Sequence, residues 1–174
     1  IVSPGGYGEQ YARNLGLLYA YPEADTGAVA SEKAEAEEKQ SGDWTYVVQE
    51  DGTACITKWA GSDEDLTIPD ALDGLTVTAI GGGAFRACDS LNSIIVPDSV
   101  TSIGEGAFDS CEYLTSITLP DTVTAIGDSA FLDCAALTSI TLPNAITSIG
   151  ERMFRNCDSL TSIIIPDSVT IIGE

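Results

Sequence analysis

The residues with the clearest chemical potential are cysteines at a constant spacing. Cys88, Cys111, Cys134 and Cys157 follow one another at intervals of 23 residues. Structural zinc sites use cysteine pairs separated by only a few residues, and this spacing provides none. We therefore expect each cysteine to fill a small buried slot in a repeated unit. Side chains in such a column point the same way, so free thiols rather than disulfides are predicted.

The sequence is poor in residues for acid–base and nucleophilic catalysis. It contains no histidine, so Ser-His and Cys-His pairs are absent from the chain. Its 27 acidic residues could supply the carboxylate pair of a glycoside hydrolase, but no pair is singled out by position. The sequence thus predicts no catalytic residue, no cofactor and no enzymatic activity for this chain.

One acidic stretch is the candidate for cation binding. "GSDEDLTIPD" contains Asp63, Asp65 and Asp70. These residues lack the ligand spacing of a calcium-binding EF-hand loop. A solvated loop is therefore the favoured interpretation, and metal binding is the alternative.

A second acidic set recurs with the repeat, directly after a proline. Asp98, Asp121 and Asp167 occupy this slot, and Asn144 takes it in a fourth unit. Asn and Asp can both hydrogen-bond the backbone of a turn, whereas only Asp carries charge. The slot therefore predicts turn formation rather than calcium binding.

The charge balance restricts the partners. Seven basic and 27 acidic residues give a net charge of −20, which would repel phosphate backbones and anionic lipid surfaces. A helix that crosses a bilayer needs about 20 consecutive apolar residues, and the sequence contains no run of that length. We predict no nucleic-acid partner and no membrane span.

The interval of the cysteines is shared by apolar residues, prolines and glycines. Phe, Pro and Ile-Gly slots repeat at 23 residues, with Phe85, Phe108, Phe131 and Phe154 as one example. A unit of this length cannot bury its own apolar side chains, so successive units must stack as a solenoid. We expect a mainly β repeat solenoid in which "LTSITLP" and "VTAIG" are strands and "SAFLDC" is a short helical or 3-10 turn. Pro69 precedes Pro97 by 28 residues, which places an inserted loop around "ALDGL" in the first unit.

The composition and the residue pattern differ between the two parts of the sequence and predict two regions. Residues 1–43 read as an acidic linker or the remnant of an upstream module, partly helical or disordered, with Tyr11, Leu15 and Leu18 on one face of a short helix. Residues 44–174 read as the repeat domain. It starts with a cap hairpin (44–62) and continues in coils at 63–90, 91–113, 114–136, 137–159 and an incomplete 160–174.

Partner-binding candidates fall into two sets. By strand alternation, an outward ladder includes Ile95, Thr118, Thr141 and Ile164. Turn positions that vary between units include Tyr113, Leu132 and Arg155. For both sets the alternative is an ordinary solvated surface.

The units "LNSIIVPDSVTSIGEGAFDSC", "LTSITLPDTVTAIGDSAFLDC" and "LTSITLPNAITSIGERMFRNC" resemble the BspA-like leucine-rich-repeat family of bacterial surface proteins. The resemblance covers residues 45–174 and not 1–43. It implies a right-handed leucine-rich-repeat coil with an N-terminal β-hairpin cap, located at the cell surface or secreted. It also implies a protein ligand, with a host extracellular-matrix or surface protein as the candidate.

We therefore expect a non-enzymatic protein-binding or adhesion module. The alternatives are a structural spacer that displays another domain, or an accessory repeat region of a larger enzyme. We also expect the chain to be part of a longer protein, with any export signal outside it. Ligand identity and oligomeric state stay open at this point.

Overall fold

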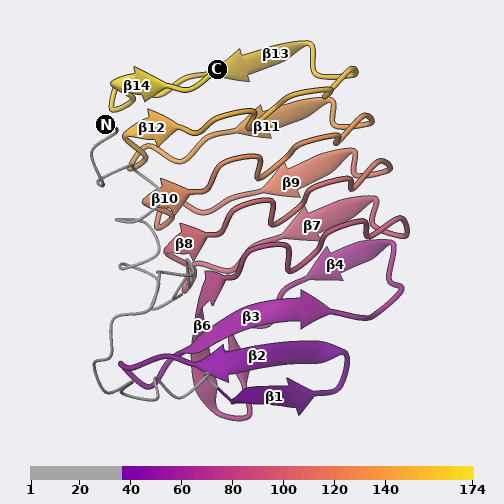
Figure 1. Cartoon of the computed structure of the whole chain (residues 1–174), viewed down its shortest axis with the longest axis vertical. Helices are drawn as coiled ribbons and strands as arrows, with labels where there is room; N and C mark the ends of the chain where they lie inside the picture. Colours follow the sequence, from indigo (N-terminus) through magenta and orange to yellow (C-terminus); the bar gives the residue numbers. More distant parts are fainter. Residues whose placement is uncertain (1–36) are drawn as a thin grey trace, which may run out of the picture.

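A computed structural model describes residues 37–174, which form strands and turns without a helix. Short coils stack along the longest axis of the molecule, from the indigo cap to the yellow last coil (Figure 1). This arrangement confirms the predicted β-solenoid. The helix predicted around Tyr11, Leu15 and Leu18 lies outside the described residues.

The cap is a three-stranded antiparallel meander rather than a single hairpin. Strands β1 (Glu38–Ser41), β2 (Trp44–Val48) and β3 (Ala54–Trp59) pair in sequence order. The cap therefore begins at Glu38, inside the segment 1–43 that the sequence assigns to a linker. Strand β1 is polar and largely exposed, so backbone pairing with β2 rather than burial of side chains positions it.

Two tryptophans of the cap cover the first turn of the repeat. Trp44 and Trp59 lie 6.1 and 6.0 Å from Phe85 between ring centroids, and 6.3 Å from each other. The backbone N–H of Trp59 also donates to the carbonyl of Ala84. The cap thus closes the end of the apolar interior that would otherwise face water.

The insertion in the first unit forms a second hairpin instead of a plain loop. After β4 (Asp65–Thr67), strands β5 (Ala71–Leu72) and β6 (Leu75–Ile80) pair antiparallel. They are joined by Asp73 and Gly74, whose φ angles are 50° and 83°. Positive φ at both central residues is the geometry of a tight β-hairpin turn.

Asp73 at the tip of this hairpin contacts the cap. Its two carboxylate oxygens accept hydrogen bonds from the hydroxyls of Ser41 (2.7 Å) and Tyr46 (2.8 Å). These bonds hold the pKa of Asp73 below its usual range and raise that of Tyr46. The insertion therefore ties the first coil to the cap.

Each later coil contributes two short strands. The first strands are β7 (Ser93–Ile95), β9 (Ser116–Thr118), β11 (Ser139–Thr141) and β13 (Ser162–Ile164). The second strands are β8 (Ser102–Ile103), β10 (Ala125–Ile126), β12 (Ser148–Ile149) and β14 (Ile171–Ile172). Both expected strand segments are confirmed.

The first strands form one parallel sheet in the order β13-β11-β9-β7-β4. Ser93 pairs with Ser116, Ser116 with Ser139 and Ser139 with Ser162, so identical slots are in register. On the other side β3, β6, β8 and β10 pair in parallel, and β12 pairs with β14. Within the described residues this second ladder is interrupted between β10 and β12. There the Asp128 carboxylate accepts the N–H of Glu151 at 2.9 Å.

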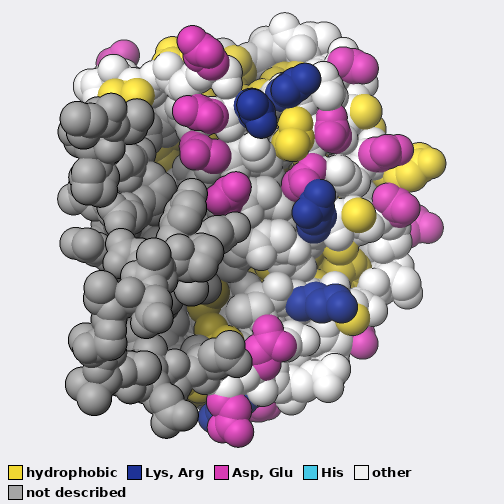
Figure 2. Space-filling model, viewed as in Figure 1, with side chains coloured by type: hydrophobic (Ala, Val, Ile, Leu, Met, Phe, Trp, Pro, Cys, Tyr) yellow, Lys and Arg dark blue, Asp and Glu magenta, His cyan; other side chains and the backbone are white. Residues whose placement is uncertain are grey.

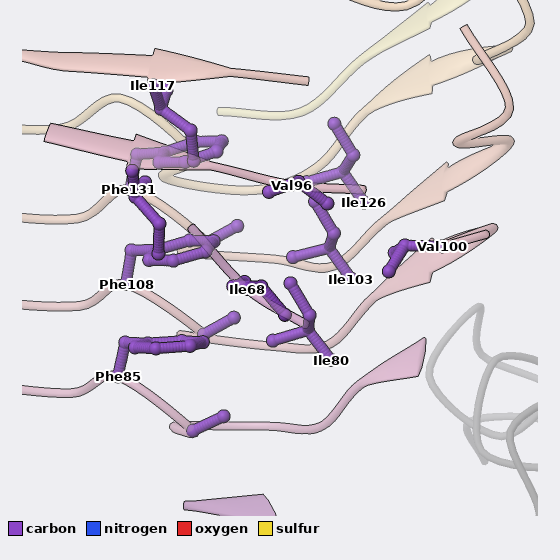
Figure 3. Close-up of a cluster of buried hydrophobic side chains, with 14 of the residues drawn as sticks. Ile68, Ile80, Phe85, Val96, Val100, Ile103, Phe108, Ile117, Ile126 and Phe131 are labelled. Carbon is purple, nitrogen blue, oxygen red and sulfur yellow. The ribbon is translucent and has the colours of Figure 1, made fainter. Parts of the chain in front are cut away.

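The core consists of columns of identical side chains. Phe85, Phe108 and Phe131 are fully buried and stack one above the other (Figure 3). Phe154 continues the column, and successive ring centroids lie 5.2, 5.5 and 5.6 Å apart. The isoleucine column follows the same axis, but its exposure rises from 0% at Ile80 to 63% at Ile172. Burial therefore depends on having a coil on both sides.

The "SAFLDC" segments are turns, as predicted, with isolated bonds such as that from the Leu132 N–H to the Ser129 carbonyl (3.0 Å), but they do not form a helix. In one coil the N–H groups of Gly106, Phe108 and Ser110 donate to carbonyls of the following coil, at 2.8–2.9 Å. Gly106 and Ser110 have φ angles of 57° and 61°, and the other coils repeat this pattern. Because these donors point to the next coil, they cannot form the bonds within one segment that a helix requires.

Candidate functional site

The outer face of the sheet β4-β7-β9-β11-β13 is a regular surface that contains the predicted outward ladder. Ile95, Thr118, Thr141 and Ile164 form one exposed column along it, as alternation predicted. The two isoleucines are 48% and 76% exposed, and the intervening threonines carry no charge. The face offers apolar and hydroxyl contacts without a fixed charge of its own beyond Asp65 of β4.

The threonines that precede the strands are already engaged within the stack. The hydroxyl of Thr115 donates to the backbone and side-chain oxygens of Asn92 at 2.9 and 3.1 Å, and that of Thr138 donates to the carbonyl of Thr115. These groups stabilise the register of neighbouring coils. The outward side chains of Thr118 and Thr141 have no such bond among the described contacts, so their hydroxyls face solvent.

A hollow of about 500 Å³ lies where the turns enter this sheet. It is lined by the polar residues Ser62, Glu64, Asp89, Asn92 and Thr115 together with Tyr113. Asn92 and Thr115 directly precede β7 and β9, so the hollow adjoins the outer sheet face. Tyr113 is 61% exposed beside it.

The structure brings Tyr113 together with two acidic residues of another coil, Glu64 and Asp89. The sequence marks Glu64 as part of the acidic stretch and Asp89 as a variable turn position, but it does not predict that both lie beside Tyr113. Aligning the repeat units indicates that Tyr113 is unusual, because Ser90 and Ala136 occupy its slot in the adjacent coils. A large side chain between small ones leaves room at the surface, but only the stacked geometry shows which residues border that room.

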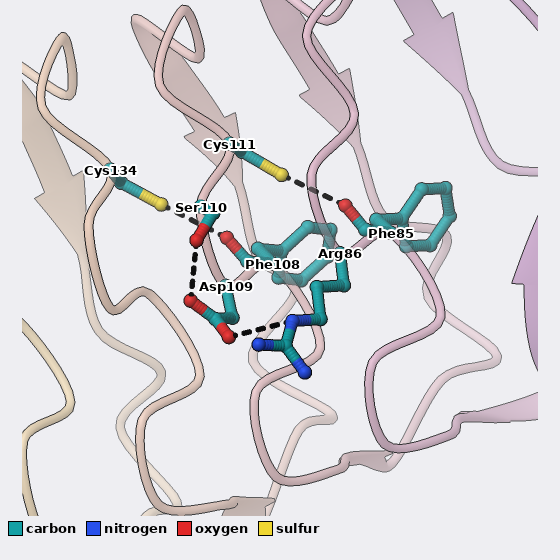
Figure 4. A network of polar contacts seen from close by, with 7 residues as sticks. All are labelled: Phe85, Arg86, Phe108, Asp109, Ser110, Cys111 and Cys134. Atoms are coloured by element: carbon teal, nitrogen blue, oxygen red, sulfur yellow. Dashed lines mark hydrogen bonds and ion pairs between the residues drawn. The ribbon is translucent and has the colours of Figure 1, made fainter.

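The other two turn candidates lie elsewhere. Leu132 is half-buried, Arg155 is exposed, and neither lines the hollow. Earlier in the same slot, the guanidinium of Arg86 pairs with the carboxylate of Asp109 at 3.0 Å (Figure 4). Asp109 also accepts the Ser110 hydroxyl at 2.9 Å. This slot therefore connects coils in its first two members, and the candidates do not converge on one site.

Lysine and arginine side chains are scattered among acidic ones on the face in view in Figure 2, without forming a continuous basic surface. Within residues 37–174 the structure contains no group of three metal-ligating side chains. Asp63, Asp65 and Asp70 are therefore not brought together as a cation site. The carboxylate of Asp65 instead accepts hydrogen bonds from Ser93 and Asn92 of the next coil.

The proline-following acidic column also differs from its prediction. Asp121 accepts the backbone and side-chain N–H groups of Asn144 in the next coil, both at 3.3 Å. The side chain therefore connects neighbouring coils rather than bonding within its own turn. The mixture of Asp and Asn in this slot supplies both an acceptor and a donor.

All five cysteines are free. Burial raises the pKa of Cys55, Cys88 and Cys157 to about 11 and that of Cys111 to about 12. It raises the pKa of Cys134 further still. A thiol nucleophile must be deprotonated to react, so these groups are held in their unreactive form.

No helix between residues 37 and 174 combines the length and the apolar character needed to cross a bilayer.

The family model for the BspA type leucine-rich-repeat region matches residues 62–174 in six copies. No curated protein matches the chain.

Solved structures of bacterial leucine-rich-repeat proteins share the fold. A protein from T. pallidum is 35% identical, with a TM-score of 0.74 over 79% of this chain and 64% of that one. A protein from Bacteroides ovatus is also 35% identical, with a TM-score of 0.71 over 78% of this chain and 37% of that one. A leucine-rich cell surface protein from Faecalibacterium prausnitzii is 30% identical, with a TM-score of 0.63 over 79% of this chain and 45% of that one.

This chain thus spans less than two thirds of each of these proteins. The repeat spacing, the stacked strands and the family match agree over the same residues. The chain belongs to the BspA-type leucine-rich-repeat family of bacterial proteins.

Proposed function

We propose that this chain is a non-enzymatic protein-binding or adhesion module of a bacterial cell-surface or secreted protein. The observation that carries the proposal is the outer face of the sheet β4-β7-β9-β11-β13. It is regular, formed by parallel strands in register, and exposes Ile95 and Ile164 on either side of Thr118 and Thr141.

The physical basis is the low cost of covering this face. Removing apolar surface from water contributes roughly 25 cal/mol per Å², whereas desolvating unpaired charges would oppose binding. The exposed column carries no charge, and its threonine hydroxyls can exchange water for partner groups. The stacked β-strands hold these side chains at fixed positions, so binding costs little conformational entropy.

Location at the cell surface is supported by the cell-surface description of the Faecalibacterium prausnitzii protein. A host extracellular-matrix or surface protein is the partner class that we propose from the family resemblance. Because the chain is strongly acidic, a ligand with a basic surface is favoured over one with an acidic surface.

The test is binding of the immobilised chain to a panel of extracellular-matrix proteins, measured by biolayer interferometry. The variant Thr118→Lys/Thr141→Lys places two long charged side chains on the outer face. The control Thr147→Lys places one lysine at an exposed position before β12, on the other side of the coil.

Saturable binding that the double variant abolishes, and that the control retains, supports the proposal. Absence of binding to every panel member, or binding unchanged in the double variant, contradicts it. Absence of binding to every panel member would favour the alternative role of a structural spacer.

A further inference from the structure

We propose that the hollow beside Tyr113 receives a lysine or arginine side chain of the bound protein. This inference rests on the proposed binding function and makes it more specific. It assigns a basic anchor residue to the partner and places that anchor at the edge of the outer sheet face.

The first support is the isolation of Tyr113 in its column. In the preceding and following coils the same slot holds Ser90 and Ala136, and all three residues border the hollow. Neighbouring parallel strands lie about 4.8 Å apart, so these small side chains leave the faces of the tyrosine ring uncovered. Tyr113 as a whole residue is 61% exposed, in agreement with this. An aromatic ring uncovered in this way can contact a cation over its face.

The second support is the pair of carboxylates on the cap side of Tyr113. Glu64 and Asp89 both line the hollow and are exposed. Among the described residues, neither takes part in a side-chain hydrogen bond or an ion pair, and the residues that line the hollow include no lysine or arginine. The negative charge of the hollow is therefore not neutralised by any basic side chain among residues 37–174.

The remaining polar groups do not compete for this charge. The Asn92 amide donates to Asp65 at 3.4 Å, and its side-chain oxygen accepts the Thr115 hydroxyl at 3.1 Å. Asn92 is thereby held between neighbouring coils. The hollow thus presents an aromatic face and two unneutralised carboxylates on a fixed polar floor.

This combination fits an organic cation better than a metal ion or an anion. Within residues 37–174 there is no group of three metal-ligating side chains, and hard cations such as calcium require six or more oxygen ligands. An anionic group would be repelled by Glu64 and Asp89. A lysine or arginine side chain satisfies both features, because its charge meets the carboxylates while its stem or guanidinium plane lies against the ring.

The test uses the full chain labelled with ¹⁵N and three short capped peptides, Gly-Lys-Gly, Gly-Arg-Gly and Gly-Gln-Gly, titrated in low salt. Single cations are chosen because a chain of net charge −20 would attract polycations over its whole surface. We expect the amide signals of Asn92, Tyr113 and Thr115 to shift with the lysine or arginine peptide and not with the glutamine peptide.

Matched variants separate the contributions. Tyr113→Leu keeps apolar bulk but removes the ring, and should weaken binding about threefold. Tyr113→Phe keeps the ring and should bind as the unmodified chain does. Glu64→Gln and Asp89→Asn should each weaken binding by roughly two- to fivefold, whereas Asp167→Asn removes the same charge far along the chain and should not.

Equal shifts with the glutamine peptide, or weakening by Asp167→Asn that equals that by Asp89→Asn, would overturn the inference. The peptides probe only the hollow, whereas the matrix-protein panel probes the outer face. Failure of the peptides with intact panel binding therefore rejects the basic anchor alone. Peptide binding without any panel binding rejects the proposed function while leaving the cation site.

Discussion

The thiol of Cys111 donates a hydrogen bond to the carbonyl oxygen of Phe85, 3.0 Å away in the preceding coil. The same carbonyl also accepts the backbone N–H of Cys88 at 3.3 Å. Cys134 and Cys157 repeat this relationship at 3.2 and 3.1 Å with the carbonyls of Phe108 and Phe131. Figure 4 shows the bonds of Cys111 and Cys134. The slot thus calls for a side chain that is small and apolar yet still able to donate.

Replacing one of these thiols should cost more than replacing a buried cysteine whose thiol makes only a long hydrogen bond. Cys134→Ala should lower the free energy of unfolding by about 2 kcal/mol, since packing and a hydrogen bond are both lost. The control is Cys55→Ala, because Cys55 is also buried but its thiol donates only a long hydrogen bond, 3.9 Å, to the carbonyl of Ile56. We expect about 1 kcal/mol there. Urea unfolding measures both values, and equal losses would show that the bond contributes nothing.

The cysteines should make the fold sensitive to alkaline pH. Burial raises the thiol pKa of Cys55 and Cys157 to about 11 in the folded state, whereas an unfolded thiol ionises near about 8.5. The protonated form is therefore favoured by folding. Its stabilising contribution is complete below about 8.5 and is lost as the pH rises toward the folded value.

Thiol labelling checks this directly. At pH 8 a pKa near 11 leaves roughly two hundredfold less thiolate than in a free cysteine peptide, whose pKa is about 8.5. Labelling of the native chain by iodoacetamide should be slower by about that factor, and urea should make all five thiols reactive. Cys88, which is only half-buried, should react first. Native labelling at the rate of a free peptide would contradict the burial argument.

Asp73 should contribute to stability at neutral pH and lose that contribution in acid. Its pKa is lowered chiefly by the hydroxyl of Ser41, then by that of Tyr46 and the charge of Lys39. The folded state thus favours the carboxylate, so stability is present above the unfolded value of about 3.9 and falls as the pH drops through the lower folded value.

The variant Asp73→Asn should unfold at a lower temperature at pH 7, and the difference from the unmodified chain should shrink below pH 4. Asp70→Asn is the matched control, since it removes the same charge from the same region without a contact to Ser41 or Tyr46. Thermal unfolding followed by circular dichroism provides the measurement. A difference that stays constant from pH 7 to pH 2 would exclude the proposed ionic contribution.

The phenylalanine column should respond according to position. Phe108 is fully buried between Phe85 and Phe131, whereas Phe154 at the end of the column is half-buried. Phe108→Leu should cost about 1–3 kcal/mol through lost ring stacking and imperfect packing. Phe154→Leu should cost less than half as much. If the end residue proved equally costly, packing on both sides would not be what sets the stability of a coil.

The sequence predicts the stack well because its cause is periodic. Ile103, Ile126 and Ile149 occupy identical slots, so one repeated pattern predicts both a strand and the equivalent strand of the next coil. The outward positions of Ile95 and Thr118 follow from alternation within those strands. At these positions the local residue preferences agree with the fold, so the sequence is sufficient to predict the strands.

Elements that depend on other coils were not predictable in the same way. Ala107 and Phe108 suit a helix by composition, yet Ser110 takes a positive φ because its N–H is directed to Leu132 of the next coil. Strand β1 has no apolar pattern and exists through its partner β2. The contact of Asp73 with Ser41 joins residues 32 positions apart.

The candidate site also has one feature that could be predicted from the sequence and one that could not. The exposure of Tyr113 could be inferred from its slot, since its neighbours there are small. Its association with Glu64 and Asp89 requires the first and second coils to be superimposed, and the insertion before β6 shifts that superposition. Only the folded arrangement places these carboxylates beside the ring.

The parallel ladders give the chain a mechanical property. Hydrogen bonds between coils run roughly along the long axis of the molecule, and each strand of the sheet β4-β7-β9-β11-β13 pairs only with its immediate neighbours (Figure 1). A pulling force between the cap and the last coil would therefore open one layer at a time, as in unzipping. Each released coil of 23 residues frees roughly 70–80 Å of slack chain. Under load the domain would lengthen in discrete steps, each of which can refold onto the layer that remains.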